Sequence, residues 1–195
     1  PSWKEVHLKA FLESRFGVPV NVNNDANCYA MGAYGIYPAD AKPETLVTVT
    51  LGTGIGIGVV DHGRLICGVN CGAGELGYID YKDGCLEEYC SRQYFDKLGV
   101  KAHEVAAAAN EGDAEAIGIF NEFGRNLGHA IMILMYAYDP SHIVFGGGIA
   151  NALPLFRDTM EEYIKRKFPF RSNFENLQID VRTNGEIPII GASLI

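Results

Sequence analysis

Hydrophobic residues recur along the chain with two different periods, which predict a succession of helices and strands. Where apolar residues return every three or four positions, the spacing is typical of a helix with one face turned toward a core. Short runs that are rich in β-branched residues, or that alternate apolar and polar positions, indicate strands. We expect helices at residues 3–16, 26–34, 86–97, 102–110, 114–138 and 152–167, and strands at 19–22, 45–51, 57–60, 64–67, 143–145 and 177–181.

Local signals mark several ends of these elements. Ser2 followed by Glu5 forms a capping-box pattern at the start of the first helix, and Gly17 is expected to end it. Residues 23–25 (Asn-Asn-Asp) would cap the second helix, and residues 61–63 (Asp-His-Gly) predict a hairpin turn. Because strands and helices alternate, the sequence predicts an α/β fold with a mixed sheet.

The composition is that of a globular chain. Of the 195 residues, 48% are hydrophobic and 21% are charged, which is enough apolar material for a substantial core. No apolar run approaches the roughly 20 residues that a membrane-spanning helix needs, so we expect no membrane insertion. Residues 1–5 lack the features of a signal peptide and look like the middle of a longer chain.

Charge and cysteine content narrow the class of protein further. Sixteen Lys and Arg against 24 Asp and Glu give a net charge of −8, which argues against binding of nucleic acid by this part of the protein. The cysteines form an odd set of five without a C-x-x-C pair, so we expect reduced thiols in a cytoplasmic protein.

Two glycine-rich segments follow predicted strands and could hold an anion. The backbone N–H groups of Gly52-Thr53-Gly54 could approach a phosphate closely, and the Thr53 hydroxyl could donate as well. The second segment, Gly146-Gly147-Gly148, lies between a strand and a helix, where open α/β sheets tend to bind ligands. For each segment, a plain tight turn explains the glycines about equally well.

Asn24 and Asp25 stand at another junction between a strand and a helix. Asx residues at such a junction are expected simply as helix caps. A carboxylate beside a phosphate site is also where a general base for a hydroxyl nucleophile belongs. The histidines His7, His103, His129 and His142 show no partner pattern and are expected to be surface or packing residues.

Five short motifs occur in a fixed order along residues 24–192. They are N-D-A-N, L-G-T-G-I-G, A-G-E-L-G, G-C-L-E and the glycine triplet after an apolar strand, with I-G-A-S near the end. This order resembles the ROK family (repressors, open reading frames and sugar kinases). The resemblance implies an actin/hexokinase-like ATPase fold with two α/β lobes that close on a sugar and ATP.

The resemblance also implies roles for particular residues. Asp25 would be the general base, and Asn24, Glu75, Tyr78 and Glu87 would contact the sugar. The nucleotide would be held by two segments, with Gly52, Thr53 and Gly54 facing the ATP phosphates and Gly146, Gly147 and Gly148 lying against the adenosine. Magnesium (Mg²⁺) would arrive with the nucleotide and be held by few protein groups.

The sequence departs from the family pattern at the usual zinc site. Family members commonly carry a His where this chain has Tyr78, followed by a run of cysteines that bind a structural zinc. Here the following stretch is short, and Cys85 is the one cysteine that remains of the run. Because Cys67, Cys71 and Cys90 with His62 match no common zinc spacing, we expect zinc to be absent. Tyr78 also makes the sugar contact at this position different from that of a His.

The second departure concerns the phosphate motif Asp-x-Gly-Gly-Thr, which does not occur in this sequence. We therefore expect residues 1–195 to be the C-terminal lobe of a longer protein, inactive alone. The expected activity is ATP-dependent phosphorylation of a hexose or N-acetylhexosamine, with glucose as the default, by a homodimer. The alternatives are a sugar-sensing repressor with an upstream DNA-binding region, and a degenerate scaffold. Asp25, Thr53 and Gly54 favour the kinase, because a sensor has no chemical need for them.

Overall fold

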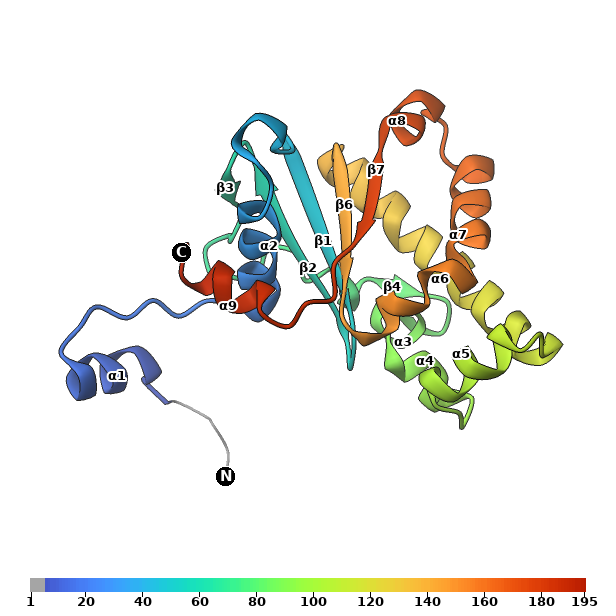
Figure 1. Cartoon of the computed structure of the whole chain (residues 1–195), viewed down its shortest axis with the longest axis horizontal. Coiled ribbons are helices and arrows are strands. Elements are labelled where there is room, and N and C mark those ends of the chain that lie inside the picture. Colours follow the sequence, from blue (N-terminus) through green and yellow to red (C-terminus); the bar gives the residue numbers. More distant parts are fainter. Residues whose placement is uncertain (1–5) are drawn as a thin grey trace.

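A five-stranded mixed sheet forms the centre of the computed structural model, which describes residues 6–195 (Figure 1). The predicted capping box of Ser2 and Glu5 lies outside the described residues. The strands, in spatial order, are β3 (Arg64–Leu65), β2 (Ile55–Asp61), β1 (Thr45–Leu51), β6 (His142–Gly146) and β7 (Gln178–Val181). Strands β1, β2 and β3 pair antiparallel, whereas β6 runs parallel to both β1 and β7. The prediction of an α/β fold with a mixed sheet is confirmed.

The central strands bury both of their faces because helices cover each side of the sheet. Along β1, Val47 and Val49 belong to the larger core, whereas Leu46 belongs to a smaller core on the opposite face. Helices α2 (Asp25–Gly35) and α9 (Ile187–Ala192) cover the smaller core. Helices α6 (Ala114–Tyr138) and α7 (Leu153–Lys167) cover the larger one, as Figure 1 shows.

The remaining elements surround this centre. They are α1 (Leu8–Phe16), η1 (Ala39–Ala41), η2 (Leu76–Tyr78), the hairpin of β4 (Asp80–Tyr81) and β5 (Gly84–Cys85), α3 (Leu86–Cys90), α4 (Arg92–Lys97), α5 (Ala102–Asn110), η3 (Gly148–Ala152) and α8 (Arg171–Asn176). Helices α3, α4 and α5 lie beside α6, at the edge of the sheet where β1 ends (Figure 1). No helix within residues 6–195 is long and apolar enough to cross a membrane.

Several predicted boundaries are confirmed, because local capping sets them. The Asn24 side chain caps α2 by accepting hydrogen bonds from the backbone of Ala26 and Asn27, and Asp113 caps α6 in the same way. Gly17 ends α1 in the left-handed conformation, with φ of 67°. The predicted ranges 45–51, 102–110 and 114–138 match β1, α5 and α6.

Other predictions differ from the structure. Residues 19–22 form no strand, although they are rich in valine. The helix predicted over 86–97 is broken at Ser91, whose extended backbone separates α3 from α4. The strand predicted over 64–67 is shortened to β3, and the helix predicted over 3–16 is described from Leu8. No residue of α1 is buried, and Figure 1 shows this helix standing apart from the sheet.

Candidate active site

The two glycine-rich segments meet at the edge of the sheet that is formed by the carboxyl ends of β1 and β6. Because β1 and β6 are parallel neighbours, with Thr50 opposite Gly146, the chain leaves both strands at the same end. Gly147 has φ of 81° and lies so close to β1 that a Cβ there would overlap the Leu51 carbonyl. Glycine is therefore required at this position both by the backbone conformation and by the close approach. The sheet places the segment 52–54 directly beside the triplet 146–148.

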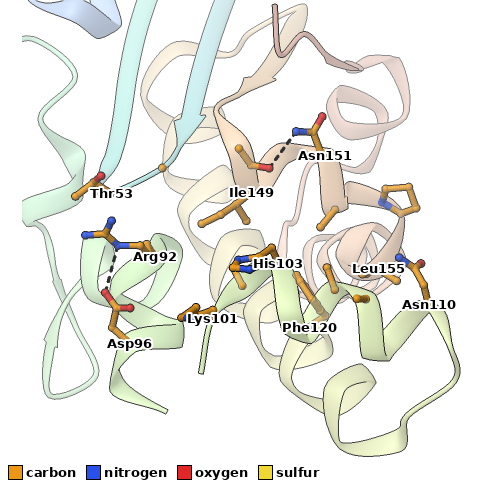
Figure 2. A pocket seen from close by; sticks show the side chains of 17 residues that line it. Thr53, Arg92, Asp96, Lys101, His103, Asn110, Phe120, Ile149, Asn151 and Leu155 are labelled. Carbon is orange, nitrogen blue, oxygen red and sulfur yellow. Dashed lines mark hydrogen bonds and ion pairs between the residues drawn. The ribbon is translucent and has the colours of Figure 1, made fainter. Parts of the chain in front are cut away.

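A pocket of about 880 Å³ opens beside these segments (Figure 2). Gly52, Thr53 and Gly148 line it, and its other walls come from α4, α5, η3 and the start of α7. Figure 2 shows Thr53 and Arg92 at one end and Asn110 and Leu155 at the other. A ligand in this pocket would have one end against the glycine-rich loop and the other between helices.

The lining of the pocket divides into a cationic part and an apolar part. Arg92, Lys101 and His103 bring basic groups, and the Arg92 Nε atom lies 3.3 Å from Asp96 Oδ2. Apolar surface comes from Ala106, Ala107, Phe120, Ile149 and Leu155. Basic groups near backbone N–H groups suit phosphates, and an apolar slot suits a flat aromatic base.

Sequence reasoning did not find the basic residues of this pocket. The His103 side chain is 79% exposed, as expected of a surface residue, but its place in the pocket lining was not predicted, and Arg92 and Lys101 were not singled out. They lie about 40 to 50 residues after Gly52 in the chain, and no motif spacing joins them to it. The one local signal was Ser91, whose side chain caps α4 and so marks Arg92 as the first residue of that helix.

Asp25 stands at the same edge of the sheet as the glycine segments. It begins α2, its side chain is exposed, and its Oδ1 accepts a hydrogen bond of 2.9 Å from the Ala26 backbone. A cavity of about 250 Å³ is shared by Asp25, Thr50 and Gly147. Asp25 and Gly147 therefore line the same cavity.

Asn24 and the three glycines 146–148 differ in how far a ligand could reach them. The Oδ1 atom of Asn24 is engaged as the helix cap, which leaves its amide N–H₂ group as the part that could reach a ligand. Gly148 lines the large pocket, whereas Gly147 lines the small cavity beside Asp25. Gly146 is buried, and a Cβ there would overlap the ring of Tyr29.

Glu87 lies in contact with the phosphate-loop candidate. Its Oε2 accepts a hydrogen bond of 3.2 Å from the Ile55 backbone, and its Oε1 accepts one of 2.9 Å from the Gln93 side chain. A Cβ on Gly54 would overlap Glu87 Oε2, so glycine is needed for this approach. Gly77, from the segment that carries Glu75, also packs against Ile55 and Glu87.

Glu75 and Tyr78 are not joined to the other candidates by any hydrogen bond among residues 6–195. Both side chains are exposed, and Tyr78 is 71% exposed. Their segment is nonetheless held against the sheet, since a Cβ on Gly74 would overlap the Ile57 carbonyl. The structure thus fixes the backbone of this segment and leaves both side chains free to meet a ligand.

The residues at the position of the family's zinc site do not fit that metal. The described part of the chain contains no group of three or more His, Cys, Asp or Glu side chains that could hold a metal ion. Cys85 Sγ lies 3.7 Å from Glu88 Oε1, and burial raises the pKa of the Cys90 thiol, which disfavours the thiolate that zinc requires.

The β4–β5 hairpin is held by side chains where the family would have a metal. Tyr81 donates a hydrogen bond of 3.1 Å, and Lys82 one of 2.7 Å, to Oδ1 of the buried Asn126 on α6. Lys82 also pairs with Glu122 at 2.8 Å, and the Tyr81 ring stacks on His129. These contacts attach the hairpin to the core and so position the segment between Glu75 and Glu87.

This chain is similar in sequence to known proteins of one family. The model of the ROK family matches residues 1–194. The chain is 34% identical to a glucokinase of Halalkalibacterium halodurans, over 85% of this chain and 58% of that protein. It is 28% identical to a xylose repressor of Bacillus spizizenii, over 100% of this chain and 54% of the repressor. The chain therefore spans somewhat more than half the length of these relatives.

The fold also matches a solved structure. A ROK family glucokinase from Streptomyces griseus, in complex with glucose and AMPPNP, superposes with a TM-score of 0.81 at 26% identity. The match covers 98% of this chain and 72% of that one. The expected actin/hexokinase-like ATPase fold is confirmed. With a family model that matches nearly every residue, this chain belongs to the ROK family.

Proposed function

We propose that the full-length protein is an ATP-dependent sugar kinase and that residues 1–195 form its C-terminal lobe. The observation that carries this proposal is the position of Asp25. Its carboxylate shares a cavity with Gly147, and the segment 146–148 lies beside the loop 52–54 at the same edge of the sheet. A base near the loop that is proposed to face the phosphates is the arrangement that phosphoryl transfer to a hydroxyl requires.

In this reaction Asp25 accepts the proton of the sugar hydroxyl. The hydroxyl oxygen then forms a bond to the γ-phosphorus of ATP, the bond from that phosphorus to the bridging oxygen breaks, and ADP leaves. The base matters because a sugar hydroxyl is a weak nucleophile at neutral pH. The protein otherwise contributes position and charge.

The large pocket supplies the nucleotide site in this proposal. Gly52 and Thr53, which line the pocket, would face the phosphates together with the adjacent Gly54, and Arg92 would add positive charge. The triplet 146–148 would lie against the adenosine through Gly148. Mg²⁺ bound with the nucleotide would offset phosphate charge during transfer. A metal that keeps most of its water and phosphate ligands needs few protein groups.

The sugar would be held between the start of α2 and the segment 75–87. Asn24, Glu75, Tyr78 and Glu87 would contact its hydroxyls, with carboxylates accepting and the Asn24 amide donating. Glucose is the default substrate, and an N-acetylhexosamine is the second choice. The exposed Glu75 and Tyr78 would be covered when the sugar binds.

The lobe assignment is supported by exposed apolar side chains on α1 and α9. Phe11 and Phe16 on α1 are 65% and 66% exposed, and Ile189 on α9 is 71% exposed. Exposed aromatic and aliphatic side chains of this size are typical of a surface that another domain covers. A second lobe would bury these residues.

The alternative is a sugar-sensing repressor of the same family. The observation in its favour is that the match to the xylose repressor extends over the whole chain. Against it stand Asp25, Thr53 and the pocket with its basic residues, which serve a nucleotide rather than a sensor.

Two further proposals accompany the kinase function. The first is a homodimer, as the family resemblance implies, and the second is a cytoplasmic location, because all five cysteines are free thiols.

The experiment that tests the function uses the full-length protein. ADP release with Mg-ATP is measured across a panel of hexoses and N-acetylhexosamines. The kinase predicts turnover that depends on one sugar of the panel. Sugar binding without ADP release on any member would support the repressor instead.

A further inference from the structure

The corner between α3 and α4 holds the glycine-rich loop at two points. Ser91 is fully buried, and its Oγ accepts a hydrogen bond of 3.1 Å from the Gln93 backbone. The backbone N–H of Arg92, the residue after Ser91, donates a hydrogen bond of 2.9 Å to the Gly52 carbonyl. The start of α4 is therefore hydrogen-bonded to the first residue of the loop.

The second point of attachment runs through two side chains. The half-buried Gln93 donates to Glu87 Oε1 at 2.9 Å, and Glu87 Oε2 accepts from the Ile55 N–H at 3.2 Å. The two oxygens of a carboxylate rotate as one unit. Because Gln93 fixes one oxygen, it also fixes the other oxygen against the end of the loop.

Glu87 keeps capacity for another ligand in this arrangement. An ionised carboxylate accepts about four hydrogen bonds, and Glu87 accepts two among the described residues. The proposed sugar would use part of the remaining capacity. One carboxylate would then touch both the sugar and the backbone of the loop that faces the phosphates.

We propose that Gln93 is a positioning residue that holds Glu87 between the sugar site and the nucleotide loop, and that binding of sugar and nucleotide is coupled through this pair. The inference rests on the proposed kinase function. Sugar that binds to a correctly oriented Glu87 would stabilise the loop 52–54 in the conformation that receives phosphates. By linkage, nucleotide must tighten sugar binding by the same factor.

The coupling is measured on the full-length protein by calorimetry. The affinity for AMPPNP is determined with and without a saturating amount of the sugar that the ADP-release panel identifies. The variants are Gln93→Leu, which keeps the size but removes the donor, and Gln93→Lys, which restores a donor to Glu87. Gln178→Leu is the matched control, because Gln178 is exposed on β7.

In the parent protein and in Gln178→Leu, sugar is expected to tighten AMPPNP binding by about tenfold, within the usual range for coupled sites. In Gln93→Leu this factor falls toward one while AMPPNP still binds without sugar, and Gln93→Lys recovers most of it. An unchanged factor in Gln93→Leu, or no coupling in the parent, would overturn the inference and leave the kinase intact.

Two further outcomes separate a structural role and a failed function. If Gln93→Leu weakens each ligand alone as much as it weakens the pair, and Gln93→Lys does not rescue it, Gln93 merely supports α4 and the inference is wrong. If the parent binds neither AMPPNP nor any sugar of the panel, the proposed function itself fails, which is a different result from lost coupling.

Discussion

The backbone N–H of Arg92 donates a hydrogen bond of 2.9 Å to the carbonyl oxygen of Gly52. This bond joins the start of α4 to the loop that faces the large pocket, and the Arg92 side chain lies near Thr53 in that pocket (Figure 2). A positive charge is thereby placed next to the N–H groups expected to receive phosphates.

Arg92→Ala is expected to raise the KM for ATP by about 10- to 100-fold, because a hydrogen bond to a charged group contributes roughly 1.5–3 kcal/mol. The KM for the sugar should change little. Asp96→Asn is the informative companion, since it releases Arg92 from its 3.3 Å ion pair and should lower the KM for ATP. Steady-state kinetics on the full-length protein check both. An unchanged KM for ATP in Arg92→Ala would remove Arg92 from the nucleotide site.

Gly54→Ala is expected to lower kcat by about 100-fold, because a substrate misplaced by about 1 Å through a change away from the reacting atoms reacts more slowly by about that factor. The new Cβ would overlap Glu87 Oε2 and push the carboxylate from the loop. The control is Gly118→Ala on the exposed side of α6, where a Cβ meets nothing within 4 Å. That control should keep full activity and gain up to about 1 kcal/mol of stability from helix propensity. Full activity of Gly54→Ala would contradict the contact.

Asn126→Leu is expected to lower the free energy of unfolding by about 1–3 kcal/mol, since Tyr81 and Lys82 each lose a partner at a partly buried site. Urea titration measures the change. Asn173→Ala, at an exposed site on α8, is the matched control and should have a much smaller effect. The same titration with a chelator present should leave the parent unchanged. A large loss of stability on chelation would show that a metal, rather than Asn126, holds the hairpin.

Stability should fall as the pH drops below about 6.5, in part because of His129. Burial lowers the pKa of His129 below its ordinary value of 6.5. The unfolded chain therefore takes up the proton at higher pH than the folded protein, and acid favours unfolding in the window between the two pKa values. Above 6.5 this contribution is constant.

Urea titrations between pH 5 and pH 7 test this expectation. His129→Gln should show a smaller loss of stability across the window than the parent. Burial also lowers the pKa of His142, so some pH dependence remains in that variant and should shrink further in the double variant. A slope in His129→Gln equal to that of the parent would contradict the account.

Much of the fold could be predicted from the sequence, because its signals are local. Asp113 and Asn24 mark helix starts through their own side chains, and the β-branched run 45–51 needs no distant partner to be recognised as a strand. Residues 19–22 carry the same strand signal without a neighbouring strand to pair with in the described structure, so they stay unpaired. The break at Ser91 depends on burial and on the distant Gly52 carbonyl, which no local pattern contains.

In the candidate site, too, residues with a local signal could be predicted, whereas residues placed by distant contacts could not. The glycine segments and Asp25 are each recognisable, and the parallel pairing of β1 with β6 brings them to one edge as the family resemblance implies. Arg92, Lys101 and His103 enter the pocket through the packing of α4 and α5 against α6, which sequence spacing does not encode. α9 was also missed, because its position depends on the close approach of Gly191 to the Cys28 carbonyl and on burial of Ile187 in the smaller core, which are contacts with distant residues.

The role of Asp25 is the central claim, and Asp25→Asn tests it most directly. In the full-length protein, kcat with Mg-ATP and the best sugar is compared with that of the parent and of Asp40→Asn, an exposed control in η1. We predict that kcat falls by about 10²- to 10⁴-fold in Asp25→Asn, the usual contribution of a general base, while sugar and AMPPNP still bind and Asp40→Asn stays fully active. Retention of kcat in Asp25→Asn would contradict the account and leave Asp25 as part of a helix cap.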